Sequence, residues 1–204
     1  MDQDLASDSL TGLILAGGAS RRMGRDKALL KLGSRSLIEV VVEQVSLVCD
    51  EVLIVSCDLE PYSHFEVGVV RDVFPGVGVL GGLHAGLKAA SNELALAVGC
   101  DMPFLKPRLL RAFATWAEGF DVALLRCGEE EIEPLHGAYR RTCIPAMEDA
   151  IRAGQRRILS FFPHVRVRYV TPDEVTSVDP DLDSFRNVNT PEDWAAAQLK
   201  WSSA

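Results

Sequence analysis

The segment from Leu15 to Leu30 combines residue types that together bind phosphate groups. Its glycines would let backbone N–H groups approach an anion closely, and its basic side chains would neutralise the anion's charge. These glycines and basic residues are Gly17, Gly18, Gly24, Arg21, Arg22, Arg25 and Lys27. The segment is not a Walker loop, because that motif needs Gly-Lys-Ser/Thr in sequence and Lys27 stands three residues beyond Gly24. We therefore expect a phosphate-binding loop of another type.

A carboxylate that could hold a metal lies further along the chain. Asp101 follows the apolar run at residues 94–99 and is part of Cys-Asp-Met-Pro. An aspartate in this position can bind Mg²⁺ against phosphate oxygens, or it can cap the helix that follows. In a chain with a phosphate-binding loop, the metal role is favoured.

Apolar runs alternate with helical patterns along most of the chain. Short apolar runs bounded by glycine or polar residues indicate buried strands. They are residues 10–16, 51–56, 67–71, 94–99 and 121–126, with shorter candidates at 135–139 and 165–170. Helices are expected after the capping box of Ser36 and Glu39, at 82–90, from Pro107, at 140–153 and from Pro191.

This alternation predicts an α/β fold with three α/β/α layers. We expect a mostly parallel, Rossmann-like twisted sheet with one antiparallel edge region. Ligands bind beyond the carboxyl ends of such strands. The fold would bring together residues 17–27, residues 56–58, Asp72 and Asp101. We expect a single domain over residues 1–204, with residues 1–9 disordered.

Composition narrows the range of functions. The 204 residues include 21 Lys plus Arg and 29 Asp plus Glu, a net charge of −8, which disfavours a nucleic-acid binder. No apolar run approaches the roughly 18 residues that cross a bilayer, and the acidic start lacks the pattern of a secretory signal. The five cysteines are scattered without zinc spacing, as expected of reduced thiols in a cytoplasmic protein.

A second glycine pattern suggests a rival function. Residues 76–81 read GVGVLG and fit the dinucleotide fingerprint, with Asp101 at the distance of a ribose-binding acid. This would make the chain a nicotinamide-dependent dehydrogenase. Phe74 and Pro75 separate the preceding strand from the first glycine, however, and the rival gives the Leu15–Leu30 segment no role.

The sequence resembles the nucleotidyltransferases that use a nucleoside triphosphate and release pyrophosphate. LAGGASRRMGRDKAL is similar to their signature loop, L-A-G-G-x-S-x-R-M-G-x-D-K. Later motifs occur in the order typical of one branch, the molybdenum cofactor guanylyltransferases. They are Gly78–Gly82, Cys100–Pro103, Glu133–Tyr139 and Phe185–Asp193.

The resemblance implies a reaction and its ligands. The terminal phosphate of molybdopterin would attack the α-phosphate of GTP, with Mg²⁺ bound, and pyrophosphate would leave. The product would be the guanine dinucleotide form of the cofactor. The implied partners are these small molecules, with transient contacts to molybdopterin-handling proteins or acceptor molybdoenzymes, and neither nucleic acid nor a membrane.

The resemblance also implies nucleotide-binding residues. Backbone groups of Leu15, Ala16 and Gly17 would contact the guanine and ribose. Residues 18–24, beginning at Gly18, would wrap the triphosphate, and Asp72 would help to hold the nucleotide.

Further roles follow from the same resemblance. Arg22 and Lys27 would stabilise charge on the phosphates and on the departing pyrophosphate, as catalytic residues that act with Asp101. Asp101 would bind Mg²⁺, and Lys27 and Asp101 would also contact the nucleotide. Asn187 and Asn189 would lie near the pterin substrate, although asparagines in such a loop can also serve turn formation.

Two departures from the family pattern leave alternatives open. Val79 stands where relatives have proline, and Cys57 stands where many have an asparagine that contacts the base. A cytidylyltransferase acting on the same pterin, or another sugar or small-molecule nucleotidyltransferase, is the alternative. A catalytically silent nucleotide-binding module is a further one.

Overall fold

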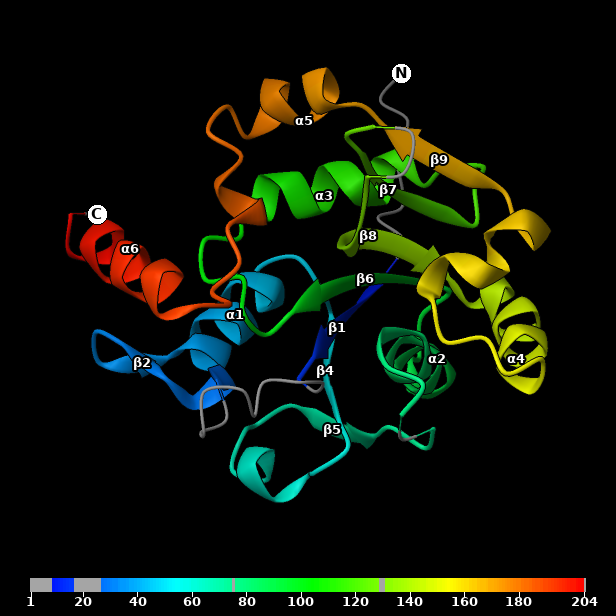
Figure 1. Cartoon of the computed structure of the whole chain (residues 1–204), viewed down its shortest axis with the longest axis horizontal. Helices are drawn as coiled ribbons and strands as arrows, with labels where there is room; N and C mark the ends of the chain where they lie inside the picture. The colour runs from blue at the N-terminus through cyan, green and yellow to red at the C-terminus, as the bar shows by residue number, and fades with distance from the viewer. Residues whose placement is uncertain (1–8, 17–26, 75, 129–130, 204) are drawn as a thin grey trace, which may run out of the picture.

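The main sheet follows the alternation expected from the sequence. The computed structural model describes residues 9–16, 27–74, 76–128 and 131–203. Over these residues the sheet has seven strands in the order β5-β4-β1-β6-β8-β7-β9 (Figure 1). The strands are β1 (Leu10–Leu15), β4 (Glu51–Ser56), β5 (Gly68–Arg71), β6 (Leu94–Gly99), β7 (Val122–Arg126), β8 (Ile132–Arg140) and β9 (Val167–Val170).

The direction of the strands confirms the expected fold class. All neighbouring pairs in the described sheet are parallel except the two that involve β8, which is antiparallel to both β6 and β7. β8 lies third from the β9 edge. The antiparallel part therefore belongs to the β8–β7–β9 end, while β5, β4, β1 and β6 form a parallel block.

Helices cover both faces of the sheet, which gives the three expected layers. Helices α1, α3 and α5 bury their apolar residues against one face, and α2 and α4 against the other (Figure 1). The helices are α1 (Leu37–Ser46), α2 (Val79–Ala89), α3 (Pro107–Trp116), α4 (Ile144–Arg152), α5 (Pro172–Val178) and α6 (Pro191–Ser202). The 3₁₀ helices are η2 (Lys27–Leu29), η3 (Glu60–Tyr62), η4 (Arg141–Cys143), η5 (Ile158–His164) and η6 (Asp183–Phe185).

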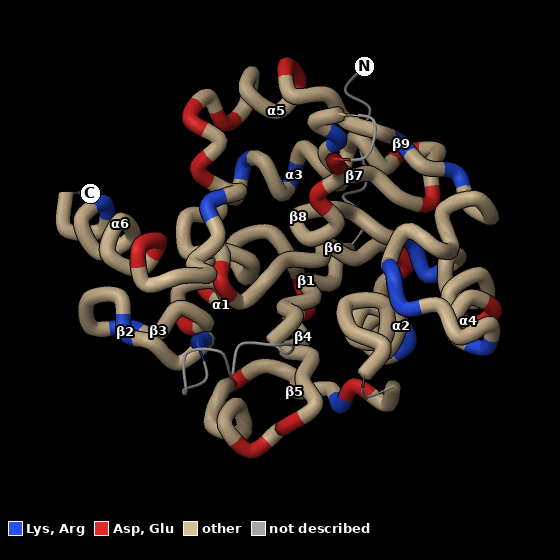
Figure 2. Tube along the Cα trace, viewed as in Figure 1, with Lys and Arg blue, Asp and Glu red and all other residues tan. Residues whose placement is uncertain are grey.

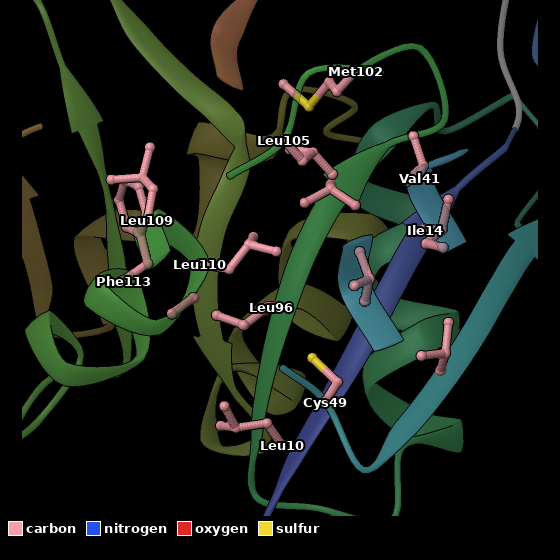
Figure 3. Close-up of a cluster of buried hydrophobic side chains, with 14 of the residues drawn as sticks. Leu10, Ile14, Val41, Cys49, Leu96, Met102, Leu105, Leu109, Leu110 and Phe113 are labelled. Atoms are coloured by element: carbon pink, nitrogen blue, oxygen red, sulfur yellow. The ribbon is translucent and has the colours of Figure 1, made fainter. Parts of the chain in front are cut away.

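The strands are apolar on both faces because both faces are buried. Ile14 contributes to the core under α1 and α3, whereas its neighbours Leu13 and Leu15 contribute to the core under α2 and α4. This alternation is the two-residue period of a strand. Figure 3 shows the first core, with Ile14 of β1 near Val41. Continuous apolar runs rather than alternating ones are therefore what this sheet requires.

Two helix starts predicted from capping residues are present. In α1, the Ser36 hydroxyl accepts from the backbone of Glu39, whose carboxylate accepts from the Ser36 backbone N–H. In α6, Thr190 and Asp193 form the same reciprocal pair. Such boxes satisfy N–H groups that the first helical turn leaves unpaired.

A small third cluster joins the end of the chain to a hairpin. Strands β2 (Lys31–Leu32) and β3 (Arg35–Ser36) form a two-stranded antiparallel sheet that the sequence patterns did not predict. Leu32, Val188 and Ala197 are buried together there, so α6 packs beside the hairpin (Figure 1). The cluster anchors the segment that precedes α6.

Some boundaries differ from those expected. The helix predicted at residues 140–153 begins only at Ile144, because β8 continues to Arg140 and η4 intervenes. Helix α5 was not predicted. The expectation of disorder for residues 1–9 falls, apart from Ser9, outside the described residues.

Glycines in and just after the dinucleotide-like pattern shape the start of α2 and its packing against β1. Gly78 is the N-cap of α2 with φ of 74°, a conformation that favours glycine. A Cβ on Gly82 would lie 3.3 Å from Leu15, and one on Gly86 would lie 3.0 Å from Leu13. The glycines therefore let α2 approach β1 closely, as the third glycine of a dinucleotide fingerprint also does.

Two surface properties complete the description. Within the described residues, every helix is too short or too polar to cross a membrane. Figure 2 shows Lys and Arg dispersed over many elements of the described chain.

Close packing at Gly12 yields a stability prediction. A Cβ there would overlap the Val45 side chain of α1, which is fully buried. We expect Gly12→Ala to lower the free energy of unfolding by about 1–3 kcal/mol through overpacking. Urea denaturation measures this. The double variant Gly12→Ala/Val45→Ala should lose less than the sum of the single variants; additive losses would contradict the overlap.

Candidate active site at the carboxyl edge of the sheet

Four strand ends meet at one edge because β5, β4, β1 and β6 run parallel. Backbone hydrogen bonds continue just beyond the strands. Ala16 N donates to Val55 O at 2.9 Å, Cys100 N to Leu15 O at 3.2 Å, and Asp72 N to Ser56 O at 2.9 Å. These bonds fix where the following side chains leave the sheet.

Three polar side chains from distant parts of the sequence converge at this edge. The Lys27 Nζ donates to Asp101 Oδ2 at 2.6 Å and to Asn189 Oδ1 at 2.8 Å. The side chains of Lys27 and Asp101 are only 11% and 18% exposed. One ammonium group thus bridges two oxygen atoms. They belong to residues that lie 74 and 162 positions after Lys27 in the chain.

Local structure holds each member of this cluster. Lys27 begins η2, and Asp101 follows β6 by two residues. Val188 N donates to Asp101 O at 2.9 Å, which ties the C-terminal segment to the Asp101 loop. The backbone N–H of Asn189 donates to Asp193 Oδ2 at 2.9 Å. The α6 capping box therefore also positions Asn189.

Gly99 leaves room for the Asp101 carboxylate. A Cβ at this position would overlap Asp101 Oδ1. The carboxylate thus turns one oxygen toward the Gly99 backbone and the other toward Lys27.

Asp72 lies on the other side of β1 from Asp101, since β4 and β5 are on one side and β6 on the other. Its Oδ1 accepts from Phe74 N at 2.8 Å, and the Cys57 thiol donates to its Oδ2 at 3.8 Å. Burial raises the pKa of the Cys57 thiol, and the Asp72 charge raises it further. Cys57 is therefore a neutral thiol next to Asp72 at neutral pH.

Asn187 and Asn189 have different surroundings. Asn187 lines a cavity of about 330 Å³ between the C-terminal segment and α6, whose walls include Phe104, Arg186 and Lys200. The Asn187 Oδ1 is buried and has no hydrogen-bond partner among the described residues. The structure thus brings Asn189 to the Lys27–Asp101 pair and directs Asn187 to a neighbouring cavity.

The remaining nucleotide-binding predictions fall partly outside the described residues. Gly17, Gly18 and Arg22 are among these undescribed residues. Leu15 and Ala16 are described: both side chains are buried at the end of β1. Their part in nucleotide binding stays a prediction.

Glu133 is a carboxylate at this edge to which the sequence reasoning assigned no role. Because β8 is antiparallel to β6, with Gly137 opposite Ala97, the start of β8 lies near the end of β6. Burial raises the pKa of Glu133; a hydrogen bond from Leu135 N lowers it, and the charge of Asp101 raises it. The sequence signal was present, since Glu133 opens the Glu133–Tyr139 motif.

His136 supports the C-terminal segment from within the core. It is fully buried in a left-handed conformation with φ of 92°. Its ring lies 5.2 Å from that of Phe113 and 4.8 Å from that of Phe185, which precedes the asparagines. Burial lowers its pKa to about 4, so the ring is neutral at physiological pH.

The oxygen atoms that hold Lys27 also suit a hard divalent cation. A carboxylate and an amide carbonyl already surround a positive charge here. Within the described residues, no group of three or more His, Cys, Asp or Glu side chains could hold a metal. Proteins usually bind Mg²⁺ through one or two carboxylates together with phosphate and water oxygens, and Asp101 could supply one such carboxylate.

A mostly parallel α/β sheet with a lysine and an aspartate at its carboxyl edge fits a nucleotidyltransferase. The family model described as "MobA-like NTP transferase domain" matches residues 12–168, and the chain belongs to this family.

Similarity to individual proteins extends over nearly the whole chain. A probable molybdenum cofactor guanylyltransferase from Pelotomaculum thermopropionicum is 40% identical over 93% of this chain and 92% of its own length. The molybdenum cofactor guanylyltransferase from Desulfosudis oleivorans is 36% identical, covering 94% and 95%. The crystal structure of molybdopterin-guanine dinucleotide biosynthesis protein A from Archaeoglobus fulgidus superimposes with a TM-score of 0.83 at 30% identity, over 95% of this chain and 100% of that one.

The raised pKa of Glu133 predicts how stability depends on pH. The folded protein disfavours the ionised carboxylate, so stability is lost as the pH rises from the ordinary pKa of 4.5 to the higher folded value. We expect Glu133→Gln to melt at a higher temperature than the wild type at pH 7, with the difference vanishing near pH 4.

Thermal unfolding at the two pH values measures this. Glu118→Gln, at an exposed glutamate, is the control and should leave the melting temperature unchanged at both pH values. A Glu133→Gln variant that is less stable than the wild type at pH 7 would contradict the assignment.

Proposed function

We propose that this chain is a molybdenum cofactor guanylyltransferase that transfers GMP from GTP to the terminal phosphate of molybdopterin and releases pyrophosphate. The observation that carries the proposal is the convergence of Lys27, Asp101 and Asn189 at the carboxyl edge of the parallel sheet. The family and the 40% identical relative support the same activity. The reaction needs no covalent intermediate on the protein, so the residues act by positioning and by neutralising charge.

Lys27 and Arg22 are the proposed charge-stabilising residues. The Lys27 ammonium reaches the edge where the α-phosphate would lie, and there it would stabilise charge that develops on the phosphates and on pyrophosphate. Arg22 is assigned from its match to the signature loop alone. Such electrostatic groups act strongly where water is excluded, which the low exposure of Lys27 supports.

Asp101 is the proposed metal ligand. Nucleotidyltransferases of this family generally use a divalent metal, and we propose Mg²⁺ for this chain. Bound there, the ion would polarise phosphate oxygens and neutralise their charge. Asp101 supplies the hard oxygen that Mg²⁺ prefers.

The nucleotide would lie along the ends of β1 and β4. We assign its base and ribose to the backbone of Leu15, Ala16 and Gly17, its phosphates to the segment that includes Gly18, and a further contact to Asp72. Cys57 donates to Asp72 and occupies the position of the expected asparagine. A thiol is a weaker hydrogen-bonding group than an amide, so base selectivity would rest more on the backbone here.

Asn187 and Asn189 are the proposed acceptor-binding residues. Asn187 lines the cavity beside α6, which supports its placement next to the acceptor. Asn189 would connect the acceptor side with the phosphate side through Lys27.

The wider setting follows from the same activity. We propose one domain for the whole chain, a cytoplasmic location, and no role for nucleic acid or a membrane. Transient contacts with molybdopterin-handling proteins or acceptor molybdoenzymes would deliver the substrate and take the product. The five free thiols are compatible with a reducing compartment.

Nucleotide selectivity distinguishes the proposed function from its alternatives. We expect GTP with Mg²⁺ to raise the melting temperature more than CTP, ATP, UTP or NADH, because a ligand stabilises the native state according to its affinity. Pyrophosphate release with molybdopterin as acceptor should require GTP. Preferential use of CTP would indicate the cytidylyltransferase alternative, and binding without pyrophosphate release would indicate a silent module.

Removal of the Asp101 carboxylate should abolish transfer. We expect Asp101→Ala to reduce the rate by at least about 10²-fold, as loss of comparable electrostatic groups does, and to weaken Mg-GTP binding while the fold is kept. The control Asp149→Ala removes an aspartate that is 75% exposed on α4. Near-normal transfer by the Asp101 variant would refute its assignment as metal ligand.

A further inference from the structure

We propose that Lys27 occupies the metal position in the nucleotide-free protein, so that Asp101 can bind a divalent cation only after a triphosphate has drawn the lysine away. This inference rests on the proposed function and concerns the order in which its ligands bind. The observation behind it is that the Lys27 Nζ lies 2.6 Å from Asp101 Oδ2 and 2.8 Å from Asn189 Oδ1. These are the oxygen atoms that a hard cation would use at this site.

The ammonium and a divalent cation cannot share these oxygens. A divalent ion bonds oxygen at about 2.0–2.6 Å, so an ion held between Asp101 Oδ2 and Asn189 Oδ1, as the ammonium is, would need the position of the Lys27 Nζ. The second carboxylate oxygen lies against Gly99, where a Cβ would overlap it, so one side of this oxygen is covered. Lys27 therefore holds the Asp101 oxygen that lies next to Asn189 before any ligand arrives.

Charge balance explains why the lysine rests here. Asp101 raises the pKa of Glu133, and the charge of Lys27 contributes to lowering the pKa of Asp193, so all three acidic groups belong to one electrostatic neighbourhood. Without a cation, the carboxylates would repel one another in a site partly shielded from water. The Lys27 ammonium supplies the missing positive charge.

A nucleoside triphosphate changes this balance. Its phosphates offer Lys27 a higher density of negative charge than the single Asp101 carboxylate. Once Lys27 pairs with the phosphates, the Asp101 oxygens are released for the cation that accompanies the triphosphate. Nucleotide and metal would thus enter as a unit, and the nucleotide-free protein would bind the metal weakly.

Asn189 is a positioning residue in this scheme. Its Oδ1 accepts from Lys27, while its backbone is fixed by Asp193 of the α6 capping box. It holds the ammonium together with Asp101. The C-terminal segment thereby stabilises the nucleotide-free arrangement.

Metal binding to the nucleotide-free, full-length chain tests the inference. Free Mn²⁺ is measured by electron paramagnetic resonance during titration of the wild type, Lys27→Met, and the control Lys31→Met, which removes an exposed lysine of β2. We expect Lys27→Met to bind Mn²⁺ at least about tenfold more tightly than the wild type, and Lys31→Met to match the wild type. The double variant Lys27→Met/Asp101→Asn should lose the gain.

Further variants distinguish a change in metal affinity from misfolding of the Lys27→Met variant. Lys27→Gln should reproduce the gain if the methionine variant is unstable, and Lys27→Arg, which keeps the charge, should stay weak. Equal Mn²⁺ affinity of the wild type and both uncharged variants would overturn the inference. Guanylyl transfer by the wild type is measured separately, so failure of the exchange and failure of the proposed function give different results.

Discussion

The parallel pairing of β4, β1 and β6 is the constraint on which the site depends. It places the carboxyl ends of the three strands at one edge and lets backbone hydrogen bonds continue to Ala16 and Cys100. Lys27 and Asp101, 74 positions apart, meet because this register is fixed. A slip of one residue would turn every side chain of a strand to the opposite face. The two cores, which receive alternate residues of β1, therefore stabilise the site as well as the fold.

The C-terminal segment adds the second requirement. Val188 is buried with Leu32 of the hairpin and Ala197 of α6 while its backbone N–H pairs with Asp101. Packing and hydrogen bonding thus bring Asn189 to the Lys27 ammonium. In the proposed function this arrangement would connect the phosphate edge with the acceptor side. Asn187, two residues before Asn189, lines a separate cavity. The two asparagines of this motif therefore lie in different surroundings.

The positive charge of Lys27 lies at the centre of the polar cluster at the carboxyl edge of the sheet. In a chain with a net charge of −8, a largely buried lysine between a carboxylate and an amide oxygen is a local exception. In the exchange proposed above, Lys27 compensates the Asp101 carboxylate until a more highly charged ligand binds it. A group with two alternative anionic partners can couple the binding of nucleotide and metal, because each ligand changes the free energy of the other's site.

The sequence by itself determined the alternation of strands and helices, the capping box of α1, and the choice of Lys27 and Asp101 as candidate site residues. These signals are local: apolar runs, turn residues and a contiguous signature loop express their meaning within a few positions. Only the tertiary structure decided that Asn189 contacts Lys27, that Glu133 lies near Asp101, and that β8 enters the sheet antiparallel. Those facts depend on packing between segments far apart in the chain, where each local pattern allows several pairings. The hairpin β2–β3 was missed for the same reason, since its strands are short and are held by their neighbours. Helix α5 was missed although Thr171, Glu174 and Pro172 form a local start signal of the kind that predicted α1.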